Sequence, residues 1–278
     1  MKKPFDGFAV KKEQGKLFAI DFGGYETRNP STIALIEKAV ELFSVKDFGW
    51  ILVNTSDREA QLFHEGLKVF AYSTMTENFA HTCPDFVYDH WRQTGLTDYE
   101  RTRLDLAAIA SPPLTDMLGW RGAPTHPARD TLVKLDDKKD FDCELIHWDR
   151  SDPNNLRATN FITFHDQIAR WRYLIDIEGT GYSGRFKLLL SSPRLVFLQD
   201  RPHKEDFFQH LVAWAHYVPV KRDLSDLRAN LAAVKADPKL ETLIIDNARE
   251  FARTYLSRAS ALQRWSDLLN GLPTPAAA

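Results

Sequence analysis

Residues 172–192 read RYLIDIEGTGYSGRFKLLLSS, an apolar strand pattern that runs through a glycine-rich turn into a helix pattern. The strand part is short and rich in Leu and Ile, and several of the other strand candidates are apolar throughout, which is typical of strands buried on both faces of a parallel sheet. Gly179, Gly181 and Gly184 follow in GxGxxG spacing. Such glycines let a backbone approach a phosphate closely, and the helix start offers unpaired N–H groups. The stretch therefore predicts a strand–turn–helix unit that can hold a phosphate.

The same turn allows more than one interpretation. Arg185 and Lys187 add positive charge where a terminal diphosphate could lie. Asp200 ends the next apolar run, near the position from which an acidic residue binds a ribose hydroxyl in dinucleotide sites. An NAD(P)-dependent oxidoreductase therefore stays open beside a diphosphate site. A glycine-rich turn without any ligand is the third possibility.

Outward from this unit, short apolar runs alternate with helical patterns along the chain. Alternation of this kind predicts an α/β doubly wound fold. Other strands are expected at 15–22, 50–56, 67–73, 104–110, 142–148, 194–200 and 216–221. Helices are expected at 30–44, 163–171, 204–214, 223–235, 237–256 and 258–270.

The composition is that of an ordinary soluble globular protein. The chain has 278 residues, 44% hydrophobic and 27% charged, with a net charge of −2, so no basic excess favours nucleic acid or an acidic membrane. Cys83 and Cys143 stand outside zinc-ligand spacings. No window reaches the apolar length of a membrane span, and the first residues lack a secretory signal pattern, so a cytoplasmic location is expected. The segment 136–142 is either a domain boundary or a surface loop within one domain.

Two further segments carry residues suited to chemistry. GWRGAPTHPARD (119–130) places Arg121, His126 and Arg129 in a Gly/Pro-rich loop, typical of phosphate binding, although surface salt bridges are the alternative. WILVNTSDRE (50–59) places Asp57 after a buried strand, where a carboxylate could act as a general base. From the residues alone, a helix N-cap is the simpler interpretation of Asp57.

In this order, the segments resemble glycosyltransferase family 90 from about residue 49 to residue 256. The 172–192 stretch is similar to KYLFNFRG and SFRFKHL segments of that family, and HYVPVKRDLSDL (216–227) to its HY-[VI]-PV-K-x-DLS segment. WRGAPTHPARD is similar to FRGS-x-x-SPxRD, and VNTSDRE to N-VRDYP. The family includes protein O-glucosyltransferases, fungal capsule-associated xylosyltransferases and bacterial lipopolysaccharide-modifying enzymes.

The resemblance implies a GT-B-like architecture, in which two Rossmann-like doubly wound lobes face a cleft. An acceptor-side lobe is then expected over 1–138, a nucleotide-sugar-binding lobe over 139–270 and a flexible tail over 271–278. The implied reaction is inverting transfer of glucose or xylose from a UDP-sugar, without metal or cofactor. The expected acceptor is a hydroxyl of a cell-surface glycan precursor, lipopolysaccharide core or capsule, at the inner membrane face.

The resemblance also implies roles for individual residues. The catalytic base falls on Asp57, and carboxylates at Glu205 or Asp206 would hold the donor ribose or sugar. The expected diphosphate-binding residues are Arg121, Gly122, Arg129, Gly179, Tyr182, Ser183, Gly184 and Arg185.

Two departures from the family pattern are visible. The proline that follows the family's Arg-Asp pair is absent after Asp57, where Arg58 and Glu59 stand. Ala123 and Pro124 replace the Ser-Arg that follows its Arg-Gly pair. These departures keep a third hypothesis open, namely a non-catalytic relative that binds a nucleotide or a glycan.

Overall fold

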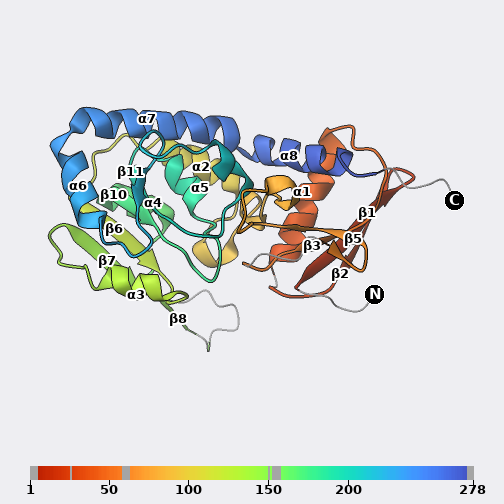
Figure 1. Cartoon of the computed structure of the whole chain (residues 1–278), viewed down its shortest axis with the longest axis horizontal. Coiled ribbons are helices and arrows are strands. Elements are labelled where there is room, and N and C mark those ends of the chain that lie inside the picture. Colours follow the sequence, from red (N-terminus) through yellow and green to blue (C-terminus); the bar gives the residue numbers. More distant parts are fainter. Residues whose placement is uncertain (1–5, 26, 58–62, 150, 152–157, 274–278) are drawn as a thin grey trace.

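The structure is a computed structural model with two α/β lobes side by side (Figure 1). It describes residues 6–25, 27–57, 63–149, 151 and 158–273. Each lobe is built on its own five-stranded sheet, flanked by helices. The predicted α/β class is therefore confirmed, with two lobes as expected.

The second lobe is a doubly wound parallel sheet. Its elements are β6 (Thr115–Gly122), α3 (Pro127–Val133), β7 (Phe141–Leu145), α4 (Phe164–Arg170), β10 (Trp171–Asp176), α5 (Phe186–Leu190), β11 (Leu195–Gln199), β12 (Val218–Val220), α6 (Leu227–Ala236) and α7 (Pro238–Tyr255). The strands lie in the order β12-β11-β10-β6-β7, and all neighbours are parallel. Counted within the lobe, this order is 2-1-3-4-5, which puts the topological switch point between β6 and β10. Ligands of such sheets bind beyond the carboxyl ends of these strands.

The first lobe has a mixed sheet. Its elements are β1 (Gly7–Glu13), β2 (Lys16–Asp21), α1 (Arg28–Leu42), β3 (Phe48–Asn54), β4 (Phe63–His64), β5 (Leu67–Ala71) and the returning helix α8 (Arg258–Asn270). Among the strand pairs of this sheet that the structure describes, only β3–β5 is parallel. Gln14 and Gly15 join β1 to β2 with φ of 50° and 77°, the backbone of a two-residue hairpin turn. Such a turn connects only antiparallel strands, so this sheet departs from the all-parallel arrangement that the resemblance implied.

Residues 104–110 were expected to form a strand, and this expectation is wrong. They overlap helix α2 (Tyr99–Ala107), which the Asp98 side chain caps by accepting a hydrogen bond from the Arg101 backbone N–H at 2.9 Å. Arg101 and Asp105 form an ion pair one helical turn apart. The strand forms further along the chain, as β6 (Thr115–Gly122). Its first three residues are not buried, and its last five are.

Other short elements differ from expectation as well. Strand β1 was not expected, and the helix predicted at 204–214 is only a 3₁₀ turn at Asp206–His210. The remaining short elements are 3₁₀ turns at Phe79–His81, Phe86–Tyr88 and Arg92–Thr94, and the two-residue strands β8 (His147–Trp148) and β9 (Ala158–Thr159).

The strand pairing divides the chain differently from the expected 138/139 boundary. Both β6 and α3 precede that boundary, yet β6 pairs inside the second sheet. The segment 136–142 is the connection between α3 and β7, in agreement with the alternative of a surface loop within one domain. Helix α8 returns to the first lobe and packs on α1, where Asn270 Oδ1 accepts a hydrogen bond from the Lys46 N–H at 3.0 Å.

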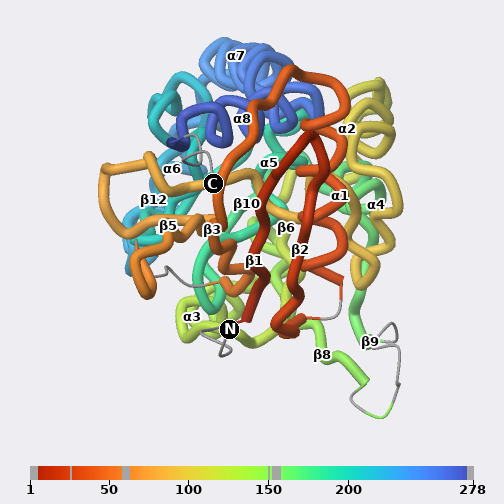
Figure 2. Tube along the Cα trace, turned by 90° about the vertical axis from the view of Figure 1, so that its right-hand side faces the viewer, coloured from red at the N-terminus to blue at the C-terminus, as the bar shows by residue number. Residues whose placement is uncertain are grey.

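The two lobes share one apolar core. One face of the first sheet packs on α1 and α8, and Figure 2 shows the opposite face of that sheet toward the viewer. Phe70 of β5 contacts Trp265 of α8, with ring centroids 6.3 Å apart. Tyr72 of the first lobe meets Tyr182 of the second at 5.8 Å. A second cluster fills the space between the second sheet and helices α3, α6 and α7.

Candidate functional site

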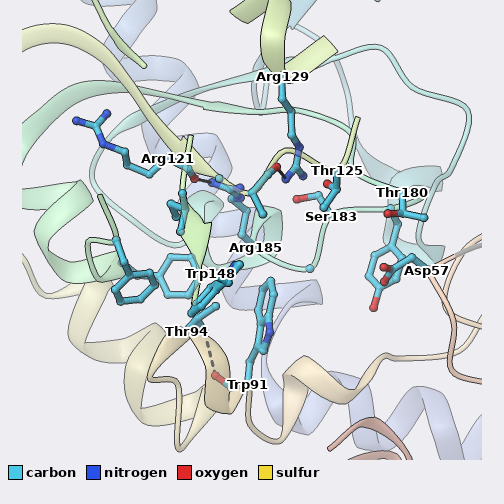
Figure 3. A pocket seen from close by; sticks show the side chains of 18 of the residues that line it. Asp57, Trp91, Thr94, Arg121, Thr125, Arg129, Trp148, Thr180, Ser183 and Arg185 are labelled. Atoms are coloured by element: carbon cyan, nitrogen blue, oxygen red, sulfur yellow. Dashed lines mark hydrogen bonds between the residues drawn. The ribbon is translucent and has the colours of Figure 1, made fainter. Parts of the chain in front are cut away.

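A pocket lies between the lobes, where β3, β6 and β10 end (Figure 3). Its wall includes Asp57 from the first lobe and Gly122, Arg129, Gly179 and Arg185 from the second. This is the switch point of the second sheet, at which a ligand is expected. The structure therefore brings together residues that the sequence places in three separate segments.

Glycines at the pocket wall allow close approach of neighbouring groups. A Cβ added to Gly179 would lie 2.9 Å from Arg129 Nη2, and one added to Gly184 would lie 2.9 Å from Val87 Cγ2. Neither glycine has positive φ, so their role is space and not backbone freedom. The helix after the turn, α5, has only five residues. The expected contribution of a helix N-terminus is therefore small.

Arg129 and Arg185 form the cationic part of the pocket. Both guanidinium groups lie 5.5 Å from the centroid of a ring of Trp120, over which they converge. Arg129 donates to the carbonyls of Glu178 at 2.9 Å and Ala123 at 2.7 Å. Within the described part of the chain, no carboxylate forms an ion pair with Arg129. The two arginines therefore offer N–H donors to an anion.

Both arginines have lowered pKa values, chiefly because they are removed from water. Burial, together with the neighbouring Arg185, lowers the pKa of Arg129 to about 9. Burial also lowers the pKa of Arg185, against the opposing effect of Asp176. An anionic ligand would relieve this unfavourable environment, because an opposite charge favours the charged form of each guanidinium.

Arg121 contributes its carbonyl to the pocket more than its charge. Its guanidinium turns away from Arg129 (Figure 3) and donates to Asp142 Oδ1 at 2.8 Å. Its carbonyl accepts a 2.6 Å hydrogen bond from Arg185 Nη1. Arg121 therefore holds Arg185 in place, and direct contact of its side chain with a diphosphate stays a prediction.

Asp57 is held at the junction of the lobes. Its Oδ1 forms a 2.8 Å ion pair with Arg28 Nη1 at the start of α1. Its carbonyl accepts a hydrogen bond from the Tyr182 N–H at 3.3 Å. The side chain is 24% exposed, so it can reach a ligand in the pocket. The alternative of a helix N-cap depends on residues 58–62, which lie outside the described residues.

Arg28 was not among the predicted site residues. Burial alone would lower its pKa, but the adjacent Asp57 and Tyr182 outweigh burial, so the pKa is raised. Arg28 also lies over the ring of Phe86, 5.1 Å from its centroid. Its distance from Asp57 in the sequence leaves no local signal, and only the fold brings the pair together.

Tyr182 and Ser183 are buried in the turn. Ser183 Oγ donates to Asp176 Oδ1 at 2.7 Å, and Arg201 Nη1 lies 2.5 Å from Asp176 Oδ2. Arg185 Nε is 3.6 Å from the same carboxylate. Asp176, the last residue of β10, was not among the predicted site residues, and it holds the Gly179–Arg185 turn against the end of β10. Contact of Tyr182 or Ser183 with a diphosphate stays a prediction.

Glu205 and Asp206 do not lie among the residues that line this pocket. Glu205 is buried, and its Oε1 is 2.7 Å from Lys187 Nζ. Asp206 Oδ2 lies 3.4 Å from Arg264 Nε. The expected role in donor binding is therefore not supported, because the buried Lys187 already engages Glu205 and the half-buried Arg264 already engages Asp206. Lys187 itself, expected beside a phosphate, is fully buried beneath the turn.

An aromatic wall lies beside the cationic part of the pocket, and it was not predicted. Trp148 of β8 and Phe161 contact each other with ring centroids 5.7 Å apart. Trp91 lies next to the turn, since a Cβ on Gly184 would be 3.4 Å from its Cζ3. Single aromatic residues in short connecting segments give no pattern that sequence analysis can detect.

His126 and Asp200, which the sequence singled out, lie outside the residues that line the pocket. His126 caps α3, with Nδ1 accepting from the Ala128 N–H at 3.2 Å. Asp200 is exposed and does not line the pocket, so the structure does not join it to the glycine turn as a dinucleotide site requires.

Among the described residues, no group of three His, Cys, Asp or Glu could hold a metal ion, and a metal-independent reaction stays a prediction. No helix in the described ranges has the length and apolar character needed to cross a membrane.

Comparison with known proteins adds an independent finding. The model of glycosyl transferase family 90 matches residues 39–272. Protein O-glucosyltransferase 1 of Homo sapiens is 28% identical over 226 residues, 73% of this chain and 56% of that protein. Protein O-glucosyltransferase 3 of Homo sapiens is 33% identical over 146 residues, 51% of this chain and 29% of that protein. The chain thus spans about half the length of protein O-glucosyltransferase 1.

A solved structure also shows similarity. It is the C-terminal domain of a glycosyl transferase group 1 family protein (LpcC) from Francisella tularensis. The TM-score is 0.36 at 12% identity, over 57% of this chain and 92% of that chain.

Proposed function

The chain belongs to glycosyltransferase family 90, and on that premise we propose that it transfers glucose or xylose from a UDP-sugar to a hydroxyl of a cell-surface glycan precursor. The names of its relatives, protein O-glucosyltransferases, support a sugar transferase with a glucosyl donor. Lipopolysaccharide core or capsule is the proposed source of the acceptor. The donor, the acceptor and the inverting course of the reaction are all parts of this proposal.

The observation that carries the proposal is the pairing of a carboxylate with two largely buried arginines across one pocket. Asp57 comes from the first lobe, and Arg129 and Arg185 come from the second. A transferase of this kind needs one base near the acceptor hydroxyl and positive charge near the leaving diphosphate. We assign the first role to Asp57 and the second to Arg129 and Arg185.

The proposed chemistry follows from these positions. The acceptor oxygen attacks the anomeric carbon of the donor from the side opposite the diphosphate, and its proton passes to Asp57. The bond between the anomeric carbon and the diphosphate oxygen breaks, and UDP leaves with the electron pair. Arg129 and Arg185 stabilise the negative charge that develops on this oxygen. Arg28 holds the Asp57 carboxylate in position throughout.

The first test is Asp57→Asn, which keeps the shape of the side chain but removes the base. We expect at least a hundredfold lower rate of UDP release in the presence of acceptor, because general-base catalysis contributes about that much. The affinity for UDP, measured by calorimetry, should stay within about threefold of the wild type. The donor panel holds UDP-glucose and UDP-xylose, and the acceptor panel holds glycan hydroxyls and a serine hydroxyl of a protein.

Asp200→Asn is the matched control, because Asp200 is exposed and lies outside the pocket wall. Full activity of Asp57→Asn would overturn the assignment of the base. Binding of UDP without transfer to any acceptor would favour a nucleotide-binding relative. Binding of NAD without binding of UDP would favour an oxidoreductase.

A further inference from the structure

We propose that Lys187, Asp85 and Glu205 form a buried positioning cluster that fixes the Gly179–Arg185 turn against the first lobe and thereby sets the position of Arg185. The expected effect on donor binding rests on the proposed function. The contacts within the cluster do not depend on it.

The three residues come from three separate segments of the chain. Asp85 immediately precedes the 3₁₀ turn Phe86–Tyr88, which packs against α1 of the first lobe. Lys187 lies in α5, and Glu205 immediately precedes the 3₁₀ turn Asp206–His210. The side chains of all three are at most 4% exposed. The cluster therefore joins the two lobes inside their common core.

Lys187 has one partner for each of its three N–H groups. Its Nζ lies 3.0 Å from Asp85 Oδ2 and 2.7 Å from Glu205 Oε1. It also donates to the Gly184 carbonyl at 3.2 Å. The last bond fixes the glycine that precedes Arg185. From there the Arg185 guanidinium reaches the Arg121 carbonyl at the pocket wall.

A buried ionic cluster is a weak source of stability, because removing charges from water costs about as much as their attraction returns. Such a cluster is therefore better explained by the geometry that it imposes. Lys187 can satisfy all three acceptors only when the first lobe, the turn and the segment at Glu205 are in one relative position. This requirement links the lobe that carries Asp57 to the arginine that faces the donor.

The charges of the cluster balance when one carboxylate carries a proton. One ammonium faces two carboxylates, and within the described residues Glu205 Oε2 and Asp85 Oδ1 have no hydrogen-bond partner. Burial raises the pKa of Glu205 to about 8, against the opposing effect of Lys187. We therefore place the proton of the cluster on Glu205 near neutral pH, while Asp85 Oδ2 lies 3.0 Å from Lys187 Nζ.

If Glu205 carries the proton, substitutions at Glu205 and Asp85 that look similar should have different effects. Glu205→Gln mimics the protonated acid, and the wild-type affinity for UDP should be retained within about twofold. Glu205→Asp withdraws the carboxyl from Lys187, and Asp85→Asn removes the charge that balances it. We expect both variants to lower UDP affinity at least tenfold in calorimetry.

Hydrogen exchange of the segment 179–185 provides a readout that needs no ligand. We expect at least tenfold faster exchange there in Glu205→Asp and Asp85→Asn, with β11 unchanged as the internal control. Lower stability in denaturant with wild-type exchange of the turn and wild-type UDP affinity would overturn the proposal. If Asp85→Asn does not fold, the comparison of Glu205→Asp with Glu205→Gln, in UDP affinity and in hydrogen exchange of the turn, tests the proposal.

The two proposals can fail separately. A wild-type protein that binds no UDP would overturn the proposed function, and hydrogen exchange of the turn would still decide the positioning role. A wild type and Glu205→Asp that bind UDP equally well, with equal exchange of the turn, would overturn the positioning role alone.

Discussion

Gly122 ends β6 at a point where the structure leaves no room for a side chain. A Cβ there would lie 2.3 Å from Trp120 Cζ2 and 2.8 Å from Arg185 Nη2. Gly122→Ala must therefore displace the indole or the arginine. We expect about tenfold weaker UDP binding in calorimetry, equal to about 1.4 kcal/mol.

Gly49→Ala is the matched control for this prediction. Gly49 lies in β3, and a Cβ added to it meets no heavy atom within 4 Å. This variant should bind UDP like the wild type. Wild-type affinity of Gly122→Ala would show that Arg185 is not held at the position that donor binding needs.

Individual residues also show where sequence analysis reaches its limit. Gly122, Arg129 and Arg185 line one pocket, because short motifs at the ends of parallel strands meet at one edge of a sheet, and their contact with a diphosphate stays a prediction. The direction in which a side chain points could not be predicted in the same way. Arg121 turns toward Asp142, which lies on the neighbouring strand β7, and no spacing in the sequence encodes that pairing.

At the scale of elements, the wall formed by Trp148 of β8 and Phe161 borders the cationic part of the pocket. Phe161→Ala would remove an aromatic ring from the pocket wall, and an aromatic contact of such a ring with the uracil of the donor would be worth about 1 kcal/mol. We expect UDP-sugar affinity to fall about fivefold, measured by calorimetry. Phe18→Ala, on the outer strand β2, is the control, since Phe18 is 42% exposed and lies outside the pocket wall. Equal affinities of the two variants would exclude a contribution of this wall to donor binding.

The elements were predictable where a pattern was long or strongly apolar. The central strands β3, β10 and β11 and the helices α6, α7 and α8 lie close to their expected positions. The error at 104–110 arose because a short apolar run does not distinguish a strand from the end of a helix. The Asp98 cap and the Arg101–Asp105 ion pair stabilise the helix in this segment. At β6, the apolar pattern was too short to be recognised as a strand.

At the scale of the whole molecule, the two lobes are held together by a common core and by the buried cluster of Lys187, Asp85 and Glu205. The cluster should couple the free energy of unfolding to pH through Glu205. The pKa of Glu205 is raised from 4.5 to about 8 in the folded protein, chiefly by burial. Charged groups that act on it are Lys187, Asp85 and Arg201.

The sign of this coupling follows from the proton count. Between about pH 4.5 and pH 8 the folded protein keeps the Glu205 proton, whereas the unfolded chain releases it. The contribution of Glu205 to stability is thus fully present below pH 4.5 and is lost as the pH rises to about 8. Tyr88 and Tyr99, which also face this region, have pKa values raised above 10 by burial and do not titrate in this window.

Glu205→Gln isolates this contribution, because glutamine does not titrate and every other group is common to both proteins. We expect the wild type to lose stability relative to Glu205→Gln as the pH rises from 5 to 8, and the difference to become constant above that range. Denaturant unfolding at matched pH values measures both free energies. A difference that does not change between pH 5 and pH 8 would mean that Glu205 is already ionised beside Lys187, and that the charges joining the two lobes are not balanced by a proton.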